Sequence, residues 1–93
     1  MLYYNPRADR FSLRESGIHY TVMIRGLEHR LLLALWGDPE RPLSHSEAAD
    51  IMWGGEDGPE YQDYAIASAV ARINQKIAPC RIKSVGKYLK LFY

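Results

Sequence analysis

The stretch QDYAIASAVARINQKI (62–77) is the part of the sequence that predicts the fold most directly. Its apolar positions recur at spacings of four, three and four, which is the period of an amphipathic helix. The acids of EDGPEYQD (56–63) favour a helix start because the helix dipole is positive there, and Pro79 ends the helix. The expected buried stripe consists of Ile66, Val70, Ile73 and Ile77. The opposite side consists of Tyr64, Ser68, Ala71, Arg72 and Gln75. Most of these side chains are short or carry an amide, and only one is charged.

Two further helices are expected before this segment. The hydrophobic pattern of residues 27–36 has the helical period. The sequence SHSE predicts a capping box, in which Ser44 accepts from the backbone amide of Glu47 and the Glu47 side chain reaches back. We expect the second helix to cover residues 45–52 and to stop at Gly54.

Both ends of the chain have the alternating pattern of β-strands. In the N-terminal part, LYY (2–4), RFSL (10–13) and IHYTVMI (18–24) predict a small antiparallel sheet. At the C-terminus, RIKSV (81–85) and YLKLFY (88–93) flank a tight turn and predict a hairpin. The expected fold is α+β in a single domain, 1–93, made of an N-terminal sheet (1–25), a three-helix core (27–77) and the hairpin (81–93).

The charge of the chain is distributed unevenly. Residues 1–63 hold six arginines and all eleven acids, a net charge of −5. Residues 64–93 hold six cations and no acid, a net charge of +6. Such asymmetry indicates a polyanion-binding end, although a solvated basic tail would have the same composition.

Composition and motifs exclude several classes of protein. The single cysteine, Cys80, cannot form an internal disulfide, and no apolar run reaches the length of a membrane span, so we expect a soluble protein of the reducing cytoplasm. His19, His29 and His45 share no ligand spacing, so we expect no metal and no cofactor. The chain has no phosphate-binding loop and no nucleophile motif, so we do not expect an enzyme.

The small face of the helix at 62–77 suits close approach to DNA. Short side chains such as Ser68 and Ala71 allow a helix backbone to come near base edges in the major groove. Arg72 can donate two hydrogen bonds to guanine, Gln75 can pair with adenine, and Lys76 is placed for phosphate. The alternative is that an alanine-rich exposed side only stabilises the helix.

The order of these elements resembles the winged-helix output domain of the OmpR/PhoB family of response regulators over nearly the whole chain. The stretches that carry the resemblance are LYYNPRADRF (2–11), LEHRLLLALWGDPERPLSHSEAADIMWG (27–54), DYAIASAVARINQKI (63–77) and IKSVGKYLKL (82–91). The chain departs from the family in lacking its dense arginine and lysine run on the third helix and in having a shorter wing turn at Gly86. No receiver domain is expected, so phosphorylation control does not follow.

The resemblance implies a recognition helix at residues 63–77 in the major groove and a wing at the DNA backbone. The implied DNA-binding residues are Tyr64, Ser68, Ala71, Arg72, Gln75, Lys76, Lys83, Lys87 and Lys90. Loop 54–61 corresponds to the segment that touches RNA polymerase in some family members. Its candidate contact residues are Glu56, Asp57 and Glu60.

Two functional hypotheses follow. The first is sequence-specific binding of double-stranded DNA by a stand-alone transcription regulator that acts as a homodimer, because one small module rarely reaches sufficient affinity. The alternative is a protein-interaction module that contacts RNA polymerase or assembles a complex and binds DNA little, because a fold does not fix a function. The thinner cationic run on the third helix motivates this alternative.

Overall fold

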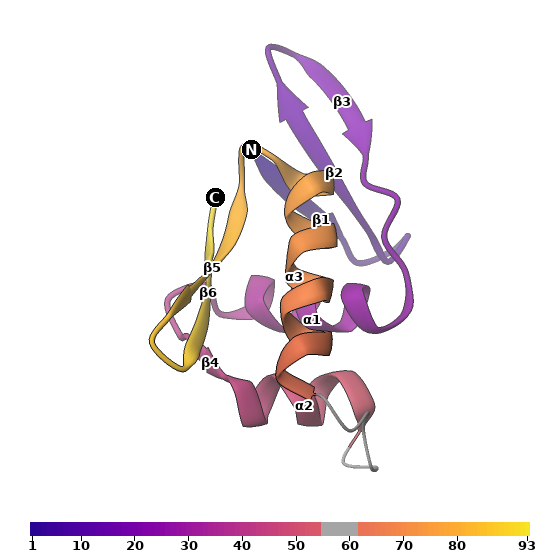
Figure 1. Cartoon of the computed structure of the whole chain (residues 1–93). Coiled ribbons are helices and arrows are strands. Elements are labelled where there is room, and N and C mark those ends of the chain that lie inside the picture. Colours follow the sequence, from indigo (N-terminus) through magenta and orange to yellow (C-terminus); the bar gives the residue numbers. More distant parts are fainter. Residues whose placement is uncertain (55–61) are drawn as a thin grey trace.

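Three helices lie between two small antiparallel sheets (Figure 1). The structure is a computed structural model that describes residues 1–54 and 62–93. The elements in chain order are β1 (Leu2–Asn5), β2 (Arg10–Glu15), β3 (Ile18–Thr21), α1 (Gly26–Gly37), β4 (Leu43–Ser44), α2 (His45–Trp53), α3 (Gln62–Ile77), β5 (Arg81–Val85) and β6 (Tyr88–Phe92). This order confirms the expected succession of sheet, helices and hairpin.

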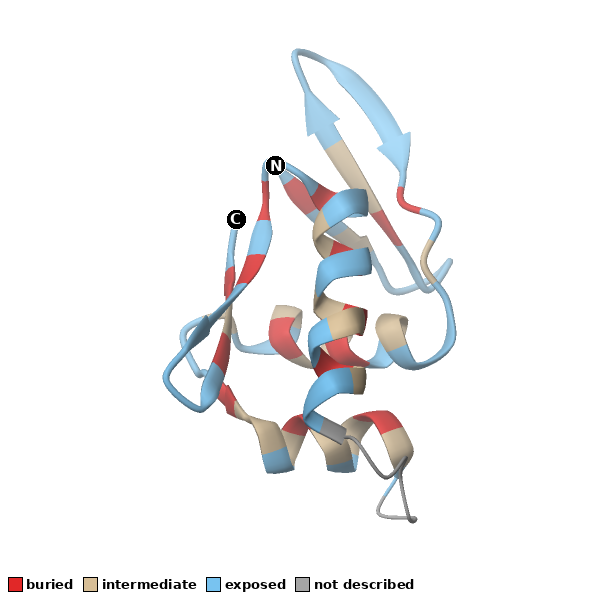
Figure 2. Cartoon of the chain, in the orientation of Figure 1, coloured by how far each residue is buried: buried red, intermediate tan, exposed pale blue. Residues whose placement is uncertain are grey.

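The N-terminal sheet has the strand order β1-β2-β3. Ser16 and Gly17 have φ values of 51° and 80°, the left-handed backbone that a tight hairpin turn requires, and they join β2 to β3. The expected third strand, 18–24, is too long, since β3 ends at Thr21, and all four of its residues are exposed. The β2–β3 hairpin extends beyond the helices, so the alternating pattern there has no core to face (Figure 2).

Helices α1 and α2 bury leucines, Ala48 and Met52 in the core. In α1 the buried residues are Leu31, Leu32 and Leu35. The predicted capping box of α2 is confirmed: the Glu47 amide donates to Ser44 Oγ at 3.1 Å, and the Ser44 amide donates to Glu47 Oε1 at 3.2 Å. Gly54 ends α2 with a left-handed φ of 64°, and its amide donates to the Asp50 carbonyl.

Helix α3 packs against the core along Ile66, Ala69, Ile73 and Ile77. Three of these four residues belong to the expected stripe. The fourth expected residue, Val70, is only partly buried, and Ala69 takes its place in the core. A stripe of spacing three, four and four rotates the helix slightly from the predicted orientation and turns Val70 toward β5 and β6.

The C-terminal sheet contains one strand more than expected. Its order is β4-β6-β5, with Leu43 of β4 opposite Leu89 of β6. Two residues are too few to show a strand period, so β4 could not be recognised from the sequence. The strand nevertheless fixes the hairpin against the start of α2, because the His45 amide donates to the Lys87 carbonyl at 3.2 Å.

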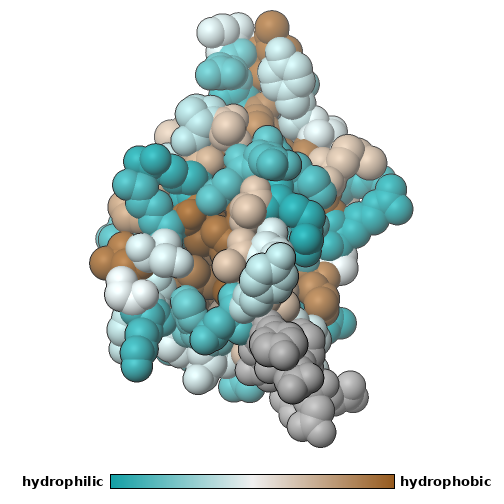
Figure 3. Space-filling view, viewed as in Figure 1, coloured by the Kyte–Doolittle hydropathy of each residue, from teal (hydrophilic) through white to brown (hydrophobic). Residues whose placement is uncertain are grey.

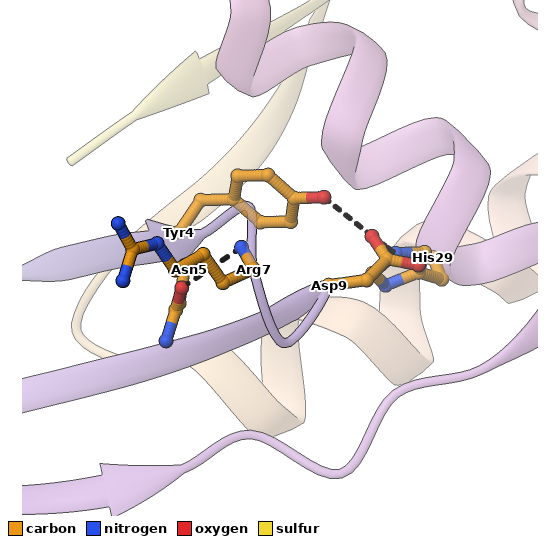
Figure 4. A network of polar contacts seen from close by, with 5 residues as sticks. All are labelled: Tyr4, Asn5, Arg7, Asp9 and His29. Carbon is orange, nitrogen blue, oxygen red and sulfur yellow. Dashed lines mark hydrogen bonds and ion pairs between the residues drawn. The ribbon is translucent and has the colours of Figure 1, made fainter.

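A polar network attaches the N-terminal sheet to α1 (Figure 4). Asp9 accepts a hydrogen bond from the Tyr4 hydroxyl, and its Oδ1 lies 2.9 Å from Nε2 of His29 on α1. The bonds from Tyr4 and then His29 hold the pKa of Asp9 below its ordinary value, and the bond to Asp9 raises the pKa of Tyr4. In the turn before Asp9, the Arg7 amide donates to Asn5 Oδ1 at 3.0 Å.

Candidate nucleic-acid interface

Helix α3 presents one side to the outside of the molecule along its whole length (Figure 1). Tyr64 is 76% exposed, Ala71 and Gln75 are exposed, and Ser68 is partly buried. These four residues share the side opposite the buried stripe, and we call them the outward stripe. Ser68 and Ala71, in the central turns, have short side chains that extend little beyond the helix backbone.

The flank of α3 that faces α1 carries two cations. Arg72 Nε donates to Glu28 Oε1 at 2.5 Å, and Lys76 Nζ lies 3.5 Å from Glu28 Oε2. Glu28 belongs to the first turn of α1, and its side chain is only 15% exposed. The Arg72 side chain remains 59% exposed, so it borders the outward stripe while Glu28 binds it on the side of α1.

The opposite flank of α3 is tied to the hairpin by Asn74. Its Nδ2 donates to the Ile82 carbonyl at 2.9 Å, and its Oδ1 accepts from the Ile82 amide at 2.7 Å. Because β5 is an edge strand, its outer backbone groups need such partners. Sequence reasoning gave Asn74 no role. The signal that could have found it is an asparagine, a poor helix former, within a strongly periodic helix.

A groove of about 280 Å³ separates α3 from the hairpin. Its lining consists of His45, Ile66, Ala67, Val70, Ala71, Asn74, Ser84 and Leu89. Figure 3 shows hydrophobic surface exposed in this hollow. His45 Nδ1 lies 3.3 Å from Asp63 Oδ1, whereas its Nε2 is buried and finds no partner among the described residues.

The lysines of the hairpin do not all point the same way. Lys83 and Lys90 are directly opposite each other on β5 and β6, and both ammonium groups lie over the Phe92 ring, at 5.7 and 5.5 Å from its centroid. Ser84 and Leu89 line the groove, so strand alternation directs the two lysines to the outer face, away from α3. Lys87 lies in the turn and lines the same pocket as Asp63, in the first turn of α3.

The structure therefore brings together only some of the predicted DNA-binding residues. Arg72 and Lys76 flank the outward stripe on the side of α1, and Lys87 lies on the side of the hairpin. Lys83 and Lys90 are on a different face. The candidate partner-binding residues Glu56, Asp57 and Glu60 lie outside the described residues.

The described part of the chain shows neither a metal-binding cluster nor a membrane-spanning helix. Within residues 1–54 and 62–93, no group of three or more His, Cys, Asp or Glu side chains could hold a metal ion. None of the helices described is long and apolar enough to cross a membrane.

Comparison with known proteins supports the fold. No family model matches the sequence, and no curated protein matches it. Among solved structures, the crystal structure of the DNA-binding domain of Bacillus subtilis CssR is similar, with a TM-score of 0.78 and 17% sequence identity. The similarity covers 99% of this chain and 100% of the other. The chain therefore has the winged-helix fold, with three helices and antiparallel sheets, that its resemblance to the OmpR/PhoB output domains implied.

Proposed function

We propose that the protein binds double-stranded DNA sequence-specifically, with α3 in the major groove and the β5–β6 hairpin as a wing beside the backbone. The observation that carries this proposal is the outward stripe, a small exposed helix surface bordered by cations on both sides. The solved structure with the same fold is a DNA-binding domain, which agrees with this use of the surface.

Each part of the surface has a role in this proposal. Ser68 and Ala71 let the helix approach the base edges, and Tyr64 contacts the duplex from the first part of α3. Arg72 reads guanine with two donors, and Gln75 reads adenine with its amide. The role is binding rather than catalysis, as in a transcription regulator.

The lysines supply the affinity that does not depend on sequence. Lys76 and Lys87 flank the stripe and would meet the nearest phosphates. Lys83 and Lys90 would reach only phosphates beside the outer face of the wing. If all four lysines neutralised one phosphate each, the slope of log K against log salt concentration would be about −3.6. Because Lys76 also faces the Glu28 carboxylate, the slope expected for the wild-type protein lies between about −2.7 and −3.6.

We further propose that the protein binds DNA as a homodimer in the cytoplasm. One small module buries only about 600–1,000 Å² on DNA, so two copies on repeated half-sites would give the affinity that a regulator needs. A contact with RNA polymerase stays a prediction, because its candidate residues lie outside the described part of the chain.

The test is selection of bound duplexes from a random pool, followed by anisotropy titrations with the selected duplex at several salt concentrations. Enrichment of one motif and a slope near the expected value would support the proposal. Arg72→Ala should weaken binding to the selected site by about 1–3 kcal/mol and relax the preference at one base pair. Arg14→Ala removes the same charge from β2, far from α3 in the sequence, and serves as the matched control. No duplex binding at about 50 mM salt, where phosphate contacts are strongest, would refute the proposal.

A further inference from the structure

Glu28 is an unusual neighbour for a DNA-reading surface. A carboxylate repels phosphate, yet this one lies next to Arg72 and Lys76, and both of its oxygens face cations of α3. It is also largely shielded from water, which strengthens its hold on both cations compared with a pair on an open surface. Within the described residues, it is the only acid that pairs with a cation of α3.

The geometry of the pair leaves Arg72 able to act. Glu28 engages Nε, on the inner edge of the guanidinium group, and the contact involves neither terminal NH₂ group. A guanidinium carries five donors in a fixed planar fork, so one edge can bind a carboxylate while another binds guanine. Holding Nε restricts the side chain to few orientations before DNA arrives, and less freedom is then lost on binding.

Lys76 is affected differently. Its ammonium is a point charge 3.5 Å from Glu28 Oε2, and that oxygen offsets part of the attraction between Lys76 and a phosphate. Glu28 thus favours the contact between Arg72 and a base, which distinguishes sequences, and weakens the contact between Lys76 and a phosphate, which does not.

We propose that Glu28 is a positioning residue that sets the sequence preference of the DNA interface. It orients Arg72 toward the base edges and withholds the charge of Lys76 from the backbone. This inference rests on the proposed function, since it concerns the selectivity of the same surface.

Two substitutions separate the two effects. Glu28→Gln removes the negative charge, so affinity for a random duplex should rise about five- to tenfold at 0.1 M salt, and the salt slope should steepen by about 0.9. Preference for the selected duplex over a scrambled one should fall by at least about fivefold, the lower end for losing one well-oriented arginine contact. Glu28→Asp draws the carboxylate back from Nε of Arg72 but keeps its negative charge within the screening length of Lys76. Preference should therefore fall while random-duplex affinity stays within about twofold of wild type.

The control is Glu40→Gln, which removes an equal charge from an exposed residue in the turn after α1. Melting curves of every variant check that the fold is kept. In an Arg72→Ala background, Glu28→Asp should no longer change the preference, because the side chain that Glu28 orients is absent.

The outcomes distinguish this inference from the function on which it rests. Absence of DNA binding by the wild-type protein would overturn the proposed function and the inference with it. Wild-type binding with a sequence preference that neither Glu28 variant alters, relative to Glu40→Gln, would overturn the role of Glu28 alone. A fall in preference that persists when Arg72 is already alanine would also overturn it.

Discussion

Replacing Asn74 by alanine should loosen the wing from α3. The substitution removes the side-chain amide that donates to the Ile82 carbonyl at 2.9 Å and accepts from the Ile82 amide at 2.7 Å. A buried backbone group left without a partner costs about 1–3 kcal/mol. Both bonds are only partly buried, so water replaces some of the loss, and we expect a total destabilisation of about 2 kcal/mol. For a domain of this size, that corresponds to a fall in Tm of roughly 8–16 °C.

Urea denaturation followed by circular dichroism measures this free energy of unfolding directly. Gln75→Ala is the matched control, because it removes a neighbouring exposed amide and should change stability by less than about 0.5 kcal/mol. Amide hydrogen exchange gives a local measurement, in which the Ile82 amide should lose protection in Asn74→Ala. An unfolding free energy within about 0.5 kcal/mol of wild type, with Ile82 still protected, would refute the reasoning that Asn74 holds the wing.

Other predictions concern acid stability and the ends of α2. The pKa of Asp9 is lowered by the bond from Tyr4, and that of Glu47 by the bond from the Ser44 backbone amide. The charged forms of these two carboxylates therefore stabilise the fold at pH values above their ordinary pKa values of 3.8 and 4.5, and this stabilisation is lost as the pH falls through the lowered pKa values. In Asp9→Asn and Glu47→Gln, Tm should consequently fall less steeply with decreasing pH in this acidic range than it does in the wild-type protein. Ser44→Ala should cost about 1 kcal/mol in urea denaturation, whereas an exposed Ser46→Ala should be nearly neutral. Gly54→Ala should cost about 1–2 kcal/mol, because alanine is strained at a φ of 64°; an unchanged midpoint would show that α2 ends differently in solution.

Local signals in the sequence were sufficient for most of the fold. The period of α3, the capping box at Ser44 and the left-handed stop at Gly54 each depend on residues within one or two helical turns. The hairpin at the C-terminus likewise follows from alternation around a tight turn. The winged-helix architecture was predictable because these short-range preferences agree with one another.

Contacts between distant segments could not be predicted in the same way. Glu28 and Arg72 are 44 residues apart, and their pairing depends on how α1 and α3 pack rather than on any spacing. The strand β4 exists only because Leu43 and Ser44 meet β6. The orientation of Lys83 and Lys90 is a different case, since both alternate with buried residues and the sequence already contained that signal.

The attachments of α3 explain how its outer surface can vary without loss of the fold. The stripe headed by Ile66 fixes the helix to the core, Glu28 holds one flank, and Asn74 holds the other. None of these contacts uses Tyr64, Ala71 or Gln75, whose side chains are exposed, and substitution of such residues changes stability by less than about 0.5 kcal/mol. If α3 reads DNA as proposed, substitutions of these exposed residues should alter base preference while the free energy of unfolding changes by less than about 0.5 kcal/mol. Under the proposed function, sequence preference would therefore be separable from stability along the outward stripe, and Arg72 would be the proposed base-reading position where the two are coupled, through Glu28.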